Sequence, residues 1–66
     1  MYQRLIERVG STGKVIEDYG GYEIIVTDNK EFPWFDVFNL LVENGFQIWI
    51  VKENDHLQIM SKPEVN

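Results

Sequence analysis

The chain has 66 residues, no cysteine and a formal net charge of −5, from eleven acidic and six basic side chains. This length holds one domain, and the lack of cysteine excludes disulfide bonds, thiolate metal sites and cysteine nucleophiles. The acidic balance opposes binding to nucleic acid and to anionic membranes, because both need a basic protein surface.

Membrane insertion and secretion are also not expected. No apolar run approaches the ~20 residues of a membrane span, and the opening MYQRLIERVG lacks the hydrophobic segment of a signal peptide. We therefore expect a cytoplasmic protein. Hydrophobic residues make up 44% of the chain, and a chain this short buries only about 60% of its unfolded surface. We expect stabilisation from this packing or from oligomerisation.

The first third of the chain predicts a short helix and a β-hairpin. Apolar residues recur at helical spacing in YQRLIERV, residues 2–9, and Gly10 suits the position after a helix end. An alternating strand over the same residues is the alternative. Two β-rich runs, 14–19 and 22–27, flank Gly20-Gly21, which can supply the positive φ of a two-residue hairpin loop.

The rest of the chain predicts a longer helix and a second hairpin. Pro33 fits the first helical position, Asp36 suits the positive end of the helix dipole, and Gly45 suits the helix end. Alternation then predicts strands over 46–53 and 56–61, joined by a turn.

The predicted fold class is α+β. It is a four-stranded, largely antiparallel sheet from two β-hairpins with one main helix between them (ββαββ), preceded by a short N-terminal helix. We expect residues 1–62 to form a single small domain and residues 63–66 to be a frayed tail.

The helical segment EFPWFDVFNLLVENG, residues 31–45, carries more apolar side chains than one sheet face can bury. At about 100° per residue, they span an arc of about 220°, whereas a helix on one sheet needs a stripe somewhat over ~100° wide. We expect the centre of the arc to meet the sheet: Trp34, Val37, Phe38 and Leu41. Phe35 and Val42 on one flank, or Leu40 on the other, then need a different partner.

The strands show the same surplus. One set of alternating residues is expected to face the main helix: Ile24, Val26, Ile48, Ile50, Leu57 and Ile59. The opposite face then carries Ile25, Trp49, Val51 and Met60. The N-terminal helix could cover that face through Leu5, Ile6 and Val9. Otherwise it is an exposed patch of the kind found at protein interfaces.

We expect this surplus to join the chain to a protein partner or to another copy, most simply as a two-fold homodimer. The predicted partner-binding residues are Phe35, Leu40, Val42, Trp49 and Val51.

Three motifs do not complete a known site. Gly10-Ser11-Thr12-Gly13-Lys14 resembles the end of a phosphate-binding loop, but Arg8 stands where that pattern needs glycine and Val15 where it needs Ser or Thr. Glu53, Asp55 and His56 are too few ligands for a calcium loop. Glu17 and Asp18 point to opposite faces of a strand and cannot share a proton. We expect no metal and no cofactor.

His56 is the only histidine of the chain. The segment LLVENGFQIWIVKENDHLQI, residues 40–59, follows the order helix, Gly-Phe, strand, turn, histidine, strand. In this order it resembles the core of the HicA family of mRNA-cleaving toxins. The resemblance implies a ribonuclease in which His56 is catalytic. The chain departs from the family by having Asn54-Asp55 where Gly-Ser precedes the histidine, and by lacking the basic RNA-binding surface.

These observations predict a small acidic, non-enzymatic protein-interaction domain. A stronger version is an inhibitor or regulator from a phage or other mobile element, which mimics the charge of nucleic acid to occupy a basic site. The alternative is a HicA-like nucleic-acid-processing domain that uses His56.

Overall fold

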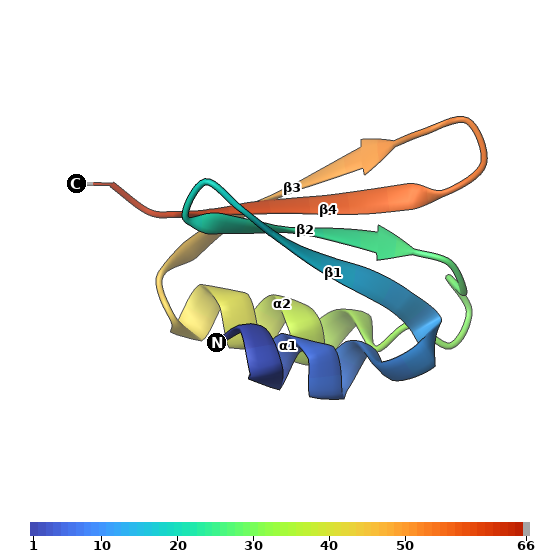
Figure 1. Ribbon diagram of the computed structural model, residues 1–66, viewed down its shortest axis with the longest axis horizontal. Helices are drawn as coiled ribbons and strands as arrows, with labels where there is room; N and C mark the ends of the chain where they lie inside the picture. Colours follow the sequence, from blue (N-terminus) through green and yellow to red (C-terminus); the bar gives the residue numbers. More distant parts are fainter. Residues whose placement is uncertain (66) are drawn as a thin grey trace.

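The computed structural model describes residues 1–65. Within them the chain forms two α-helices, one short 3₁₀ turn and four strands (Figure 1). Their order is α1 (Tyr2–Val9), η1 (Gly10–Thr12), β1 (Gly13–Asp18), β2 (Gly21–Val26), α2 (Trp34–Glu43), β3 (Phe46–Lys52) and β4 (Leu57–Pro63). The predicted α+β class, the two hairpins and the N-terminal helix are confirmed.

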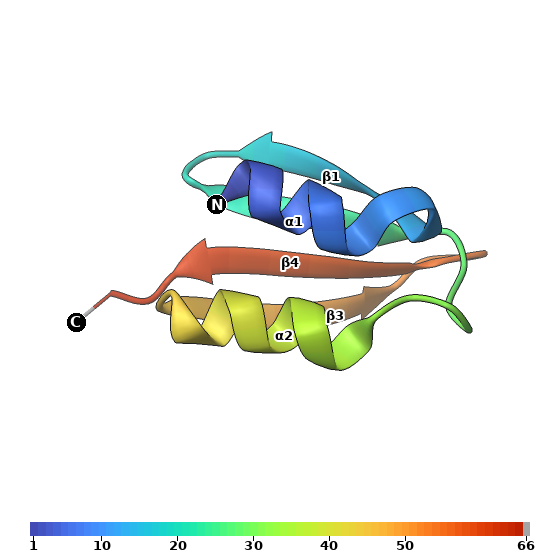
Figure 2. The ribbon, with the colours of Figure 1, turned by 90° about the horizontal axis from the view of Figure 1, so that it is seen from below.

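All four strands belong to one antiparallel sheet with the order β1-β2-β4-β3. The second hairpin therefore joins the first through β4, and β1 and β3 form the two edges. Figure 2 shows both helices on the same face, α1 beside β1 and α2 beside β3 and β4. The possibility that the N-terminal helix covers the other face is wrong, and that face has no covering element among residues 1–65.

The core lies between the helices and the sheet. Its buried apolar residues are Leu5, Val9, Val15, Tyr22, Ile24, Val26, Phe32, Val37, Leu40, Leu41 and Ile59. The strand alternation was read correctly, because the register places Ile24 of β2 and Ile50 of β3 on either side of Ile59 in β4. Trp34 and Phe38 pack half-buried against this core, as the helix pattern predicts.

The first hairpin turns one residue earlier than predicted. Asp18 pairs with Gly21, so the loop consists of Tyr19 and Gly20, with φ of 47° and 80°. Two positive φ values match the twist of a two-residue hairpin. Gly21 belongs to the strand instead, where a Cβ atom would collide with the carbonyl oxygen of Ser61 in β4.

The second half differs from prediction only at its ends. Helix α2 begins at Trp34, one residue later than expected, and ends before Gly45, whose φ is 80°. Strand β4 continues to Pro63, and the Glu64 N–H donates to the Gly45 carbonyl at 2.7 Å. The tail predicted to fray over 63–66 is therefore held to the sheet at its first two residues, and Asn66 lies outside the described residues. No helix in the described chain is long and apolar enough to cross a membrane.

Candidate functional site

Large apolar side chains that escape the core gather along one edge of the molecule. Nine such side chains are exposed among residues 1–65, and five of them belong to β3 or α2. These five are Phe35, Val42, Trp49, Ile50 and Val51, here named the β3–α2 surface. Scattered single apolar residues are normal on a protein surface, but a cluster calls for an explanation.

The outer flank of α2 supplies two of these residues. Phe35 is 82% exposed and Val42 is 62% exposed, and at seven residues apart they lie above one another on the helix. The acidic residues of α2, Asp36 and Glu43, instead line a small hollow that also includes Arg4 of α1. Asp36 also borders a hollow beside Phe35, so the outer flank of α2 is apolar with one carboxylate near its N-terminal end.

Leu40 does not belong to this surface. It is 3% exposed and lies on the side of α2 that faces α1. The helix pattern predicted that one flank of α2 is exposed but not which one. Because α1 lies on the same sheet face, it covers the flank of Leu40 and leaves the flank of Phe35 and Val42 exposed. Leu40 is therefore a core residue and is not available to a partner.

Strand β3 supplies the other three residues. Trp49 and Val51, 49% and 38% exposed, lie on the uncovered sheet face opposite Met60 and Gln58. Ile50 points to the helix side, as predicted, yet is 55% exposed. Sequence reasoning missed this exposure because alternation gives the face of a strand but not its place at the edge of the sheet.

The backbone of β3 is free along its outer side. Two hydrogen bonds fix the phase of the β3–β4 ladder: Glu53 N–H to the His56 carbonyl, at 2.9 Å, and Glu64 N–H to the Gly45 carbonyl, at 2.7 Å. Hydrogen-bonded pairs alternate in an antiparallel ladder, so the odd-numbered residues of β3 bond to β4. Ile48, Ile50 and Lys52 therefore direct their N–H and C=O groups outward, where no described strand receives them.

The opposite edge of the sheet is different. Strand β1 carries Lys14, Glu17 and Asp18 within six residues, whereas the seven residues of β3 contain one charge, Lys52. Charged side chains on an edge strand discourage pairing with another chain. β3 is thus the less protected of the two edges.

The middle of the uncovered face is partly polar. The Gln58 side-chain amide donates to the Glu23 carboxylate and lies 3.4 Å from the sulfur of Met60. This pair separates the apolar residues at β3 from Ile16 at β1. The apolar part of the face therefore continues the β3–α2 surface rather than covering the whole sheet.

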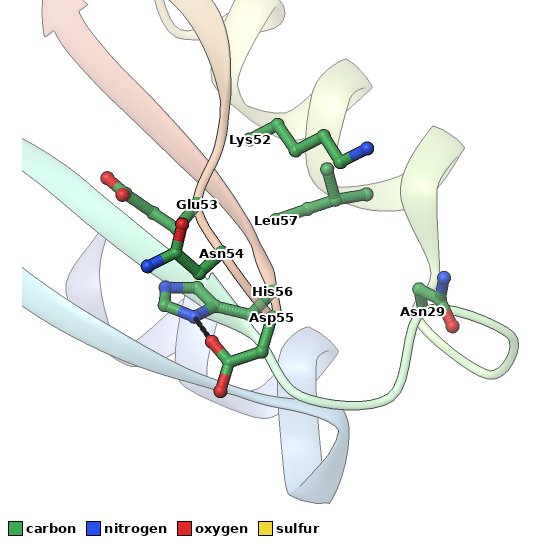
Figure 3. A pocket seen from close by; sticks show the side chains of 7 residues that line it. All are labelled: Asn29, Lys52, Glu53, Asn54, Asp55, His56 and Leu57. Carbon is green, nitrogen blue, oxygen red and sulfur yellow. Dashed lines mark hydrogen bonds and ion pairs between the residues drawn. The ribbon is translucent and has the colours of Figure 1, made fainter.

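His56, the residue that the HicA resemblance implies is catalytic, lies on the turn between β3 and β4. His56 Nδ1 is 2.9 Å from the Asp55 carboxylate, which is 89% exposed, and this hydrogen bond and the charge of His56 lower the pKa of Asp55. Both line an open hollow of about 480 Å³. Figure 3 shows the imidazole and the carboxylate together, with Lys52 pointing away from them.

An aspartate that orients a histidine can support proton transfer. Besides His56 itself, the charged residues around the hollow are two acidic groups, Glu53 and Asp55, and one base, Lys52. They do not form the basic surface that RNA needs.

Comparison with family models, curated proteins and solved structures gives no match to the chain.

The remaining motifs form no site in the structure. Gly10, Ser11 and Thr12 make the η1 turn, where the Thr12 hydroxyl donates to the Val9 carbonyl, and Lys14 lies within β1. A phosphate loop would need a helix to follow these glycines. Among residues 1–65, no three His, Asp or Glu side chains are grouped to hold a metal ion.

Proposed function

We propose that the chain is a non-enzymatic protein-interaction domain that associates with a second copy of itself through the β3–α2 surface. The observation that carries the proposal is the concentration of exposed apolar side chains on β3 and the outer flank of α2. The scarcity of acidic residues there, in a chain with eleven of them, supports it further. Interface cores are depleted of charge and enriched in aromatic residues.

The energy available is suited to a reversible dimer. Burying each side chain of the β3–α2 surface contributes about 1–2 kcal/mol, since each is already partly covered. A two-fold contact uses every residue twice, which gives about 10–20 kcal/mol from ten side chains. Association costs about 4–15 kcal/mol in lost freedom. The midpoints of these two ranges leave about 5–6 kcal/mol, so we expect a dissociation constant of about 0.1 mM.

Sedimentation equilibrium over a concentration series tests this proposal. The wild-type chain should form dimers, and Phe35→Ser should weaken dimerisation about tenfold or more. Tyr19→Ser is the matched control, because Tyr19 is 89% exposed at the β1–β2 turn, away from the β3–α2 surface. Thermal melts should show both variants folded. A wild-type chain that stays monomeric at millimolar concentration would overturn self-association.

A foreign protein is the other occupant that the same surface could take. The net charge of −5 permits a version in which the chain acts in the cytoplasm as an inhibitor or regulator of phage or mobile-element origin. Its imitation of nucleic acid would then use acidic side chains that lie outside the β3–α2 surface. Binding to such a partner should weaken steeply with salt, because charge steering is screened beyond ~8–10 Å. Salt-insensitive binding would leave apolar contact as its only basis. We make no second proposal for His56, because its surroundings are acidic.

A further inference from the structure

We infer that the second copy pairs along β3, antiparallel, about a two-fold axis at Trp49. The two four-stranded sheets then join into one sheet of eight strands. This inference rests on the proposed self-association and specifies its geometry.

The free backbone of β3 sets the possible registers. Residues opposite each other in an antiparallel pair point to the same face of the sheet. The two-fold axis must therefore lie midway between the two copies of one residue, so that this residue faces itself. β3 has seven residues and Trp49 is its middle. An axis at Trp49 pairs the whole strand, whereas an axis at Ile48 or Ile50 leaves two residues of each copy unpaired.

The hydrogen-bonding phase agrees with this axis. Ile48 of one copy lies opposite Ile50 of the other, and both direct their backbone groups outward. These two residues therefore form a hydrogen-bonded pair, and Phe46 forms another with Lys52. Trp49 meets its own copy at a non-hydrogen-bonded position, where Cα atoms approach to about 4.5 Å and side chains are closest.

The helices fit the same arrangement. Strands are spaced about 4.8 Å apart and packed helices about 8–10 Å apart, so one helix covers about two strands. In the monomer two helices cover four strands (Figure 2). Pairing through β3 places the two α2 helices about one helix diameter apart. The flanks that meet carry Phe35, Phe38 and Val42, whereas Asp36 and Glu43 lie toward α1.

A second copy fits this edge better than an unrelated strand. The exposed fractions on the β3–α2 surface correspond to roughly 500 Å² of apolar side chain per subunit. The pair therefore offers up to roughly 1,000 Å², the threshold of a specific interface, before the β3 backbone is counted. Trp49 and Val51 contribute only the sides that meet the other copy, because the sheet face on which they lie stays uncovered. The charged β1 edge does not continue the pairing, so a two-fold contact closes at two copies.

Cysteine cross-linking tests the register, because the chain has no cysteine of its own. Trp49→Cys should form an intermolecular disulfide in oxidised glutathione, since about 4.5 Å between Cα atoms lies within the disulfide range of about 4.4–6.8 Å. Gln47→Cys alone should not, because Gln47 lies four residues, about 13 Å, from its own copy. It lies opposite Val51 of the other copy, so a mixture of Gln47→Cys and Val51→Cys should cross-link, whereas each variant alone should form no intermolecular disulfide.

The mixture keeps Trp49 and therefore tests the register even if Trp49→Cys weakens the dimer. A wild-type chain that dimerises, with cross-links at Phe35→Cys but none in the Gln47→Cys and Val51→Cys mixture, would overturn pairing along β3 and leave self-association standing. A wild-type chain that is monomeric at millimolar concentration would overturn both.

Discussion

Gly21→Ala should destabilise the fold through a collision between strands. Gly21 is a buried residue of β2, and an added Cβ would meet the Ser61 carbonyl oxygen and lie 3.1 Å from both the Ser61 carbonyl carbon and Lys62 Cδ. The lysine carbon can move, but Ser61 is 1% exposed and its hydroxyl donates to the Tyr22 carbonyl at 3.2 Å. The clash therefore falls on backbone that the sheet holds in place.

Overpacking of this kind costs about 1–3 kcal/mol, and we expect about 2–3 kcal/mol because the contact is with backbone. A domain of this size has about 3–10 kcal/mol of stability in total. The melting temperature should fall by about 10–20 °C, at about 4–8 °C per kcal/mol.

Urea unfolding of the variant measures this loss. Gly20→Asn is the control, because Gly20 has no atom within 4 Å of an added Cβ and asparagine tolerates its φ of 80°. Gly20→Asn should stay within about 1 kcal/mol of the wild type. If Gly21→Ala unfolds at the wild-type urea concentration, the close approach of β2 and β4 at this position is wrong.

Four further substitutions test the burial of Leu40, the ionisation of Tyr22 and the catalytic alternative. Leu40→Ala should lower the free energy of unfolding by about 2–4 kcal/mol, whereas Val42→Ala should lower it by under about 0.5 kcal/mol in dilute monomer. Equal losses in urea unfolding would contradict the burial of Leu40. Burial, and then Glu17, raises the pKa of Tyr22 above 10.0, so the unfolded chain ionises first and stability should fall as pH rises above 10. Tyr22→Phe should lessen that fall in thermal melts, and an unchanged slope would refute the cause. Purified chain should leave RNA intact; cleavage that disappears in a folded His56→Ala variant would show an enzyme.

Local sequence signals were sufficient for the elements and their faces. Pro33 and Gly45 bound α2 to within one residue because helix ends depend on the conformations that these residues allow. The first hairpin loop was misplaced by one residue because Gly20 and Gly21 both permit positive φ. The close contact between Gly21 and Ser61 of β4, 40 residues further along the chain, places Gly21 in the strand and not in the loop.

Part of the candidate surface was also predictable from local sequence signals. The excess arc of α2 identified Phe35 and Val42, and alternation identified Trp49 and Val51. The side of α2 that α1 covers is a matter of tertiary packing, so Leu40 could not be assigned to the core from its spacing. The strand order could not be predicted either, because nothing in the sequence of β4 indicates that this strand lies between β2 and β3.

Ile48 and Ile50 connect this topology to the proposed dimer. Both lie on the helix side of β3, yet Ile48 is half-buried and Ile50 is 55% exposed. Figure 1 shows why, since the β3–β4 hairpin rises away from α2 toward its turn. In a pair centred on Trp49, Ile50 lies beside Ile48 of the other copy, close to the other α2. The side chain that its own helix leaves open would thus be covered by the helix of the second copy, and a partner strand without an accompanying helix would leave Ile50 and Phe35 in water.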